Sequence, residues 1–150
     1  RLAVQAGLIA FIPMLMGTGG NSGAQASTAV IRSLSLGDTE PRDVLRVMWK
    51  EWRVSLICGL TLAVVNFVKM LLVDGLLLQN ANVTVAVAAT VSLSIIFIVM
   101  FAKVVGSALP IAAEKIGVDP AVMSNPLIST LTDAVSLLIY IYVAKLMLHI

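Results

Sequence analysis

Four long apolar stretches follow one another along the chain and are separated by three shorter, more polar connectors. About 20 apolar residues in a helix are enough to cross the hydrocarbon core of a bilayer. The pattern therefore predicts an all-α fold, a polytopic membrane helical bundle with at least four transmembrane helices. We expect one transmembrane domain over residues 1–150, with spans at about residues 2–34, 54–73, 83–109 and 120–148.

The first of these stretches is longer than a bilayer requires. An unbroken helix from residue 2 to 34 would extend about 50 Å at a rise of ~1.5 Å per residue, whereas the hydrocarbon core is about 30 Å thick. Pro13 and a group of glycines interrupt the apolar pattern. We therefore expect this segment to tilt strongly, to break near Pro13 and the glycines, or to protrude into the cytosol.

The composition excludes an ordinary soluble domain. Hydrophobic residues make up 59% of the 150 residues and charged residues 12%, and the mean hydropathy is +1.02. Soluble domains carry about 25% charged residues. The net charge of +2 is too small and too scattered for a nucleic-acid partner, so the expected environment is a lipid bilayer.

Basic residues predict the orientation of the helices. The first connector holds Arg42, Arg46, Lys50 and Arg53, the second holds no lysine or arginine, and the third holds Lys115. Positively charged connectors stay on the cytoplasmic side. The first and third connectors are therefore expected in the cytosol and both ends of this chain outside, so a cytosolic domain upstream would require one more span.

Asp133 is the most informative residue of the last span. Polar residues recur there at three- and four-residue steps, at Asn125, Ser129, Thr132, Asp133, Ser136 and Tyr140. This spacing places them on one helix face, and an ionised carboxylate within a membrane is costly unless it faces water or a partner. We expect this face, with Thr132 and Ser136, to line a wet cavity. The structural alternative is that Asp133 pairs with Lys69 or Arg32.

The first span carries a matching polar face. Asn21, Gln25, Thr28 and Arg32 lie on one side of a helix, directly after a run of glycines. Gly19 and Gly23 form a GxxxG pair that permits close helix approach, and glycine leaves backbone carbonyls unshielded. We expect Gly20, Asn21 and Gln25 to line the same cavity; plain helix packing is a compatible alternative.

These groups are all oxygen ligands. Carboxylate, amide, hydroxyl and carbonyl oxygens suit Mg²⁺ or Ca²⁺ better than zinc or copper. Because Mg²⁺ keeps several waters and needs only one or two carboxylates, one Asp133 per chain fits a homodimer with a shared pore on a two-fold axis.

Asp119 immediately precedes Pro120 at the expected start of the last span. An aspartate followed by proline is typical of a helix N-cap. A metal-binding or regulatory role in addition is left open.

We do not expect an enzyme. Gly20-Asn21-Ser22-Gly23 matches the short motif around the nucleophile of rhomboid intramembrane proteases, but a serine nucleophile needs a base within hydrogen-bond reach. The only histidine, His149, lies at the far end of another span. A scaffold that merely dimerises through Gly19 and Gly23 is a further alternative.

Two long motifs resemble one known family. Pro13-Met-Leu-Met-Gly-Thr-Gly-Gly-Asn-Ser-Gly-Ala-Gln25 resembles the second transmembrane helix of MgtE-type magnesium transporters. Gly117-Val-Asp-Pro-Ala121, followed by Asn125-Pro-Leu-Ile-Ser-Thr-Leu-Thr-Asp133, resembles the fifth helix of that family and the turn before it.

The resemblance implies a homodimeric channel of the bacterial inner (plasma) membrane that passes Mg²⁺ without using ATP. It implies that Asp133 binds hydrated Mg²⁺ with help from the backbone of Ser129, that Asn125 lies near the cytosolic gate, and that Asp119 joins metal binding with regulatory domains. It also implies cytosolic N-terminal and CBS domains elsewhere in the full-length protein. Transport of Mn²⁺ or Co²⁺ is an alternative to selectivity for Mg²⁺.

Overall fold

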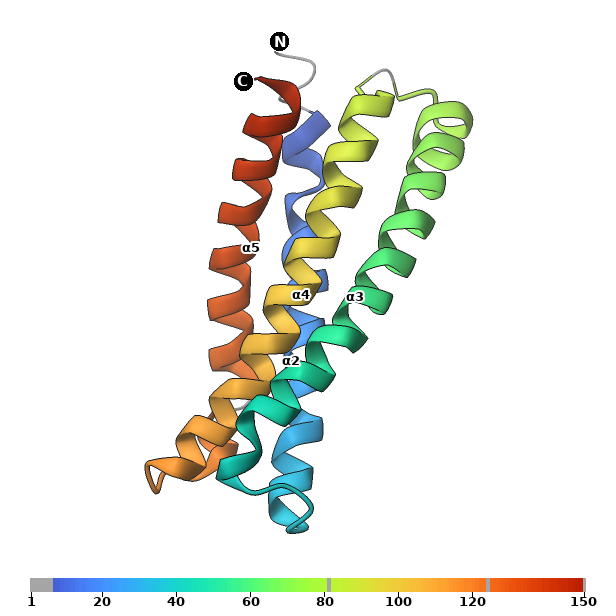
Figure 1. Ribbon diagram of the computed structural model, residues 1–150. Helices are drawn as coiled ribbons and strands as arrows, with labels where there is room; N and C mark the ends of the chain where they lie inside the picture. The colour runs from blue at the N-terminus through green and yellow to red at the C-terminus, as the bar shows by residue number, and fades with distance from the viewer. Residues whose placement is uncertain (1–6, 81, 124, 150) are drawn as a thin grey trace.

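The computed structural model describes residues 7–80, 82–123 and 125–149, and within them four long helices form an up-and-down bundle (Figure 1). They are α2 (Ile12–Ser35), α3 (Val44–Lys69), α4 (Val85–Lys115) and α5 (Asn125–Leu148). The start of α2, the end of α5 and the α3–α4 connector lie at one end of the bundle. The other two connectors lie at the opposite end, and the all-α fold class is confirmed.

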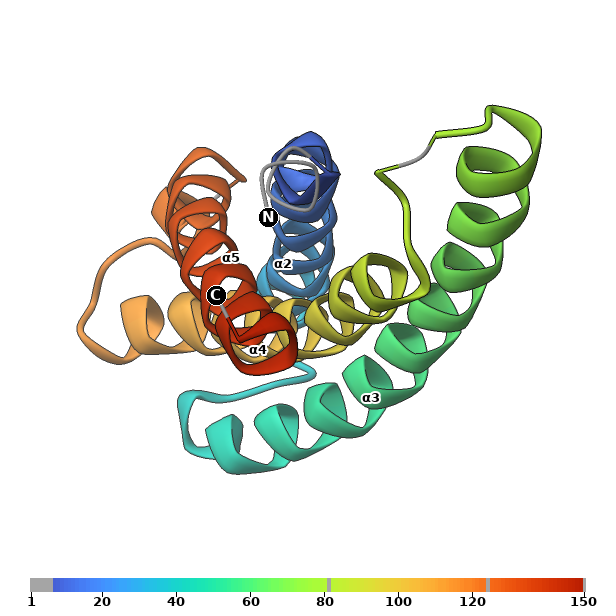
Figure 2. The same ribbon diagram turned by 90° about the horizontal axis from the view of Figure 1, so that it is seen from above.

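The central element is α4. It packs against α2, α3 and α5, while α2 also packs against α5. Figure 2 shows α4 running between α2 and α3, with α3 at the outside of the bundle. Because α2 and α3 both rest on α4, the two flanks of α2 differ: one faces α5 and the other faces the α3 side.

The first helical segment breaks before its proline. Residues 7–10 are helical, Phe11 is in a turn, and α2 then begins with Pro13 in its first positions. A proline lacks the N–H that would bond to the carbonyl four residues earlier, so the hydrogen bond from residue 13 to Ile9 is missing across this break. The helix then continues through the glycines to Ser35, so of the expected interruptions only the one near Pro13 is found.

The second expected span is part of a longer helical segment. The short helix η1 (Pro41–Asp43) leads into α3, and a π-helical segment η2 (Met70–Leu77) extends α3 without a break. The first connector is therefore shorter than residues 35–53, and the second connector begins after residue 77. An ion pair of 2.7 Å between Lys69 Nζ and Asp74 Oδ2 links α3 to η2.

The third expected span corresponds to α4. The hydroxyl of Thr84 caps the first turn by accepting a hydrogen bond of 3.2 Å from the Val87 amide. The helix continues through the buried Pro110 to Lys115. Gly117 then adopts φ of +76°, a conformation that glycine takes without steric cost, and the chain turns toward α5.

The last span begins later than residue 120. Pro120–Met123 form a short 3₁₀ helix, η3, and α5 starts at Asn125. The Asp119 carboxylate accepts a hydrogen bond of 2.9 Å from the Ala121 amide. The capping role predicted for Asp119 is therefore confirmed, but it applies to η3 and not to the long helix.

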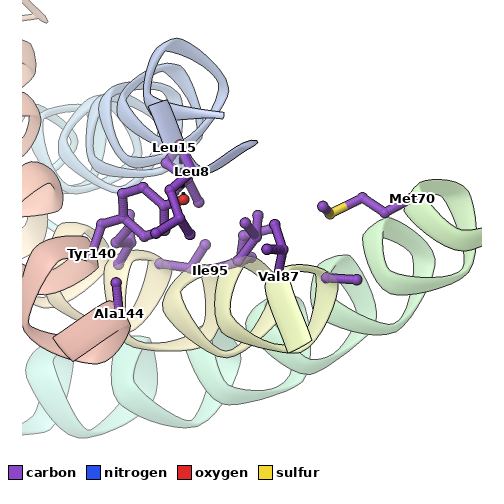
Figure 3. Packing of buried hydrophobic residues seen from close by; sticks show 11 residues of the cluster. Leu8, Leu15, Met70, Val87, Ile95, Tyr140 and Ala144 are labelled. Carbon is purple, nitrogen blue, oxygen red and sulfur yellow. Dashed lines mark hydrogen bonds between the residues drawn. The ribbon is translucent and has the colours of Figure 1, made fainter. Parts of the chain in front are cut away.

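A cluster of buried hydrophobic residues lies toward the end where α2 begins and α5 ends (Figure 3). It joins side chains of all four long helical segments, among them Leu15, Met70, Val87 and Tyr140. The Tyr140 hydroxyl donates a hydrogen bond of 2.9 Å to the Leu8 carbonyl. This contact satisfies the hydroxyl and fixes α5 to residues 7–10.

Three helical segments of the described chain are long and apolar enough to cross a membrane: Pro41–Leu77, Val85–Lys115 and Pro126–Leu148. In the most apolar window of the first, 17% of the residues are buried, against 56% in that of α4. The apolar side chains of α3 therefore face outward, as expected for a helix that contacts lipid. The span expected over residues 2–34 remains a prediction, and residues 2–6 lie outside the described part.

Candidate functional site

The glycines of α2 bring its backbone into contact with neighbouring helices. A Cβ atom added at Gly19 would collide with Ser136 Oγ on α5. One added at Gly23 would lie 2.9 Å from Ile128 Cγ2 and 3.2 Å from the Ala102 carbonyl oxygen. The packing role predicted for Gly19 and Gly23 is therefore confirmed, because the missing side chains leave room for α5 and α4 to pack against α2.

The Asp133 carboxylate lies at the seam between α2 and α5, opposite Gly20. A Cβ atom added at Gly20 would lie 3.4 Å from Asp133 Oδ1 and 3.7 Å from Ser129 Oγ. Asp133 and Ser129 are both half-buried. Since Gly20 has no side chain, the carboxylate and the hydroxyl of α5 lie next to the bare backbone of α2.

No cation neutralises this carboxylate within the described part of the chain, where Asp133 takes part in no ion pair and no hydrogen bond. Lys69 pairs instead with Asp74 at 2.7 Å. Arg32 lines an open groove on the surface of α2. The structural alternative, an Asp133 held by Lys69 or Arg32, is therefore not what the structure contains.

Thr132 and Ser136 lie on the inner side of the seam. They are 0% and 1% exposed, and the Thr132 hydroxyl is bonded to the carbonyl oxygens of Ile128 (2.8 Å) and Ser129 (3.1 Å). Periodicity placed both on the face of Asp133, but it could not show that α2 covers them. Their role in lining a pore remains a prediction.

The polar face of α2 is exposed beside the seam. Asn21, Gln25 and Arg32 line a groove of about 520 Å³. Asn21 and Gln25 also border a second hollow of about 510 Å³ between α2, α3 and α4. Neither hollow includes Asp133 among its lining residues, so within one chain the carboxylate and the amides lie on adjacent parts of the surface.

The remaining predicted ligands lie elsewhere along α5 and its connector. Asn125 is the first residue of α5, and its side chain lies outside the described part. Asp119 is exposed in the α4–α5 connector, where it caps η3. Asp133 follows Asn125 by eight residues, or about 12 Å of helix. Asp119 lies in the connector before Asn125, so Asp119 and Asp133 belong to separate regions.

One chain does not provide a complete metal cage. The described residues contain no group of three histidine, cysteine, aspartate or glutamate side chains that could hold a metal ion. At the seam, Asp133 supplies one carboxylate and Ser129 one hydroxyl. This donor set fits a cation that keeps most of its water shell, as Mg²⁺ does.

Two charged residues that were not singled out from the sequence are buried in the structure. Lys103 on α4 and Glu51 on α3 are each only 8% exposed. The position of Lys103 within the apolar run of α4 was the available signal, because ionisable residues in spans seldom face lipid.

The fold and the seam define a class of protein: a multi-pass membrane bundle in which, among the described residues, a carboxylate without an ion-pair partner lies where the glycines of α2 pack against α5. Residues 12–143 match the MgtE family, whose description is divalent cation transporter. This match covers most of the chain, and the chain belongs to the MgtE family.

Relatives in three bacteria agree with this assignment. The chain is 43% identical over 139 residues to the magnesium transporter MgtE of Thermus thermophilus and 35% identical over 139 residues to that of Bacillus subtilis. It is 29% identical over 142 residues to that of Enterococcus faecalis. These alignments cover 93–95% of the chain but only 29–30% of each relative. The chain therefore spans less than a third of their length.

Membership of this family decides between the classes considered from the sequence. The family consists of transporters and not of enzymes, so the rhomboid-like protease alternative is set aside. The Ser22 of its short motif lies within α2 and is buried, in keeping with a packing residue.

Proposed function

We propose that this chain forms the ion pathway of a Mg²⁺ transporter and that Asp133 binds the hydrated ion. The observation that carries the proposal is the position of the Asp133 carboxylate, against Gly20 at the α2–α5 seam, with no cationic partner among the described residues. An ionised carboxylate within a membrane-spanning helix is costly unless it faces water or a cation.

The seam offers a small number of oxygen atoms, and this suits Mg²⁺. The ion demands six ligands at about 2.0–2.1 Å and gives up water reluctantly. Asp133 would attract it electrostatically, while Ser129 and Asn125 would contact its water shell on successive turns of α5. Gly20, Asn21, Gln25, Thr132 and Ser136 would complete the polar wall.

A second copy of the chain would complete the pathway. One carboxylate per chain leaves the site half-built, and a two-fold axis beside α2 and α5 would bring two Asp133 side chains to one ion. The exposed Asn21 and Gln25 would then face the corresponding residues of the second copy. We therefore propose a homodimer with its pore at the interface.

Transport would be driven by the ion gradient and the membrane potential. An inside-negative potential favours entry of a divalent ion by about 4.6 kcal/mol per 100 mV, twice the value for a single charge. This requires a position in the inner (plasma) membrane. Cytosolic N-terminal and CBS domains of the full-length protein, with Asp119 near their contact, would regulate the flow.

Mg²⁺ flux into liposomes tests the assignment of Asp133. Asp133→Asn keeps the shape of the side chain and removes its charge, so we expect Mg²⁺ uptake to fall by at least about tenfold, the equivalent of 1.4 kcal/mol. Asp38→Asn, which removes an exposed charge from a connector, is the matched control and should leave uptake unchanged.

Equal Mg²⁺ flux in Asp133→Asn and the wild type would disprove the site. Parallel flux measurements with Mn²⁺ and Co²⁺ decide the range of ions. The scaffold alternative predicts that Asp133→Asn changes neither flux nor dimerisation, whereas our proposal predicts loss of flux with the dimer intact.

A further inference from the structure

We infer that Glu51 on α3 and Lys103 on α4 form a charge pair that closes the groove between α2 and α3, so that water and ions at the end of the α2–α3 connector do not reach the deeper part of this groove. Each of the two side chains is only 8% exposed. The inference needs only the placement of the bundle in a membrane, so its test is independent of the Mg²⁺ site proposed at Asp133.

The groove between α2 and α3 contains two hollows that follow one another along the bundle. Both helices pack on α4. The deeper hollow, of about 510 Å³, is bordered by Gln25 of α2 and Ile57 of α3. The connector hollow, of about 550 Å³, is bordered by Ala29 of α2 and Arg53 of α3. On each helix the two linings are a step of four residues apart, which is about one turn, so one turn of each helix separates the hollows.

The register of α3 on α4 sets the two charges at the same level. A Cβ atom added at Gly59 would lie 3.2 Å from Ile96 Cα, so the two helices touch at this point. Glu51 lies eight residues before Gly59, or about 12 Å along α3. Lys103 lies seven residues after Ile96, or about 10.5 Å along α4. Because α3 and α4 are antiparallel (Figure 1), both steps lead toward the same end of the bundle.

Both side chains also lie on the faces by which α3 and α4 pack together. On α3, Glu51, Ser55 and Gly59 follow one another at four-residue steps and are all buried. On α4, Lys103 shares a helix face with Ser92, and Ser92 accepts a hydrogen bond of 3.3 Å from an asparagine side chain of α3. The buried carboxylate and the buried ammonium group are therefore neighbours across the α3–α4 contact.

The two charges face different hollows. Helical side chains lean toward the N-terminus of their own helix, so Lys103 leans into the deeper hollow and Glu51 toward the connector hollow, and each lines the hollow it faces. This divergence explains why neither forms a direct ion pair or a hydrogen bond among the described residues. Opposite charges attract more strongly where little water lies between them, so each compensates the other across the turn that separates the hollows.

The pair favours a closed groove. Removal of one partner of a buried pair leaves the other charge uncompensated, which is costly, and water must then enter between the helices to stabilise it. The exposed Arg46, Lys50 and Arg53 also line the connector hollow, but water screens their charges, so they do not replace Lys103. Removal of both charges takes away the need for water, and the groove closes again.

Cys58 reports on this barrier, because it lines the deeper hollow and is the only cysteine of the chain. We would prepare inside-out membrane vesicles of the full-length protein, in which the basic connectors face the medium, and add a membrane-impermeant trimethylammonium methanethiosulfonate. Mass spectrometry of the Cys58 peptide gives the rate of modification. The wild type should react slowly. Glu51→Gln and Lys103→Met should each react at least about tenfold faster, which corresponds to 1.4 kcal/mol of opening.

The double variant that combines Glu51→Gln with Lys103→Met should react as slowly as the wild type. So should Lys50→Met, which removes an exposed charge from the connector hollow. Fast modification of the wild type overturns the barrier, and single variants as slow as the wild type overturn the role of the charges. A double variant as fast as the single variants overturns the pairing.

The side of the membrane separates a specific opening from a general loosening of the bundle. In right-side-out vesicles the two single variants should react no faster than the wild type. An increase there as large as in inside-out vesicles overturns the barrier. If one single variant does not fold, the comparison of the other with the double variant decides.

Discussion

At the scale of single residues, two charges lie on opposite flanks of α2. Asp133 lies against Gly20 on the α5 side, and Lys103 borders the hollow on the α3 side. Neither has an ion-pair partner within the described residues. The helix between them carries small and polar residues on both flanks, so each charge has space for water or a ligand where a packed core would leave none.

Among the glycines of the described residues, Gly106 has the tightest backbone contact, and it is with Gly23. A Cβ atom added at Gly106 would collide with the Gly23 carbonyl oxygen and lie 2.9 Å from Gly23 Cα. Backbone atoms cannot move aside as a flexible side chain can. We therefore expect Gly106→Ala to destabilise the protein by about 1–3 kcal/mol through overpacking, measured as a lower midpoint of thermal unfolding in detergent.

Gly17→Ala is the control for this substitution, because no heavy atom lies within 4 Å of a Cβ atom added there. Alanine also favours the helix over glycine. The unfolding midpoint of Gly17→Ala should therefore equal or exceed that of the wild type. A Gly106→Ala variant as stable as Gly17→Ala would contradict the close α2–α4 contact.

Residue periodicity predicted only part of the candidate site. It placed Ser129, Thr132, Asp133 and Ser136 on one face of a helix, and the structure brings that face against α2. It could not separate the half-buried Asp133 and Ser129 from the fully buried Thr132 and Ser136. That distinction depends on which neighbouring helix covers each turn, and this information is absent from the spacing within one helix.

At the scale of elements, α4 organises the bundle, and its start is fixed by a side-chain cap. The Thr84 hydroxyl accepts a hydrogen bond from the Val87 amide at 3.2 Å, which satisfies one of the free amides of the first turn. The following residues Val87, Ala88 and Val91 are fully buried, so the cap lies directly beside the hydrophobic cluster.

Removal of this cap should loosen the start of α4. Thr84→Ala is expected to cost about 1 kcal/mol of helix stability and to speed hydrogen–deuterium exchange of the Val87 amide. Thr61→Ala is the control, since the Thr61 hydroxyl is exposed and bonds only to the Ile57 carbonyl of its own helix. Unchanged exchange at Val87 in Thr84→Ala would show that the cap does not hold this turn.

The sequence predicted the order and type of the helices better than their ends. Apolar length identified the helices that match α3, α4 and α5, because a run of that length suits only a helix that crosses a bilayer. It missed the π-helical extension to Leu77 and the short η3 before α5. Both depend on local hydrogen bonds, such as the one from the Ala121 amide to Asp119, and not on hydrophobicity.

At the scale of the whole molecule, the up-and-down arrangement places the basic connectors at one end. The connectors after α2 and α4 lie together, and the α3–α4 connector lies at the other end with the end of α5. Arg42, Arg46 and Lys115 are thus on one side. The positive-inside rule assigns that side to the cytosol.

Cysteine labelling in whole cells tests this orientation. In a Cys58→Ser background, Leu78→Cys in the α3–α4 connector should react with a membrane-impermeant maleimide in intact cells. Asp38→Cys in the α2–α3 connector should react only after the membrane is permeabilised. Both native side chains are exposed, so access depends on the side of the membrane alone, and the reverse pattern would invert the assigned orientation.

The contact between Gly23 and Gly106 also bears on how the bundle moves. Where two helix backbones touch, there are no side chains between them that could change rotamer and let the helices slide. We therefore expect α2 and α4 to rotate or translate as one rigid body. Gly117, with φ of +76°, and the short η3 separate α5 from that pair. If the α2–α5 seam widens, we therefore expect the α4–α5 connector to act as the hinge and α5 to be the helix that moves.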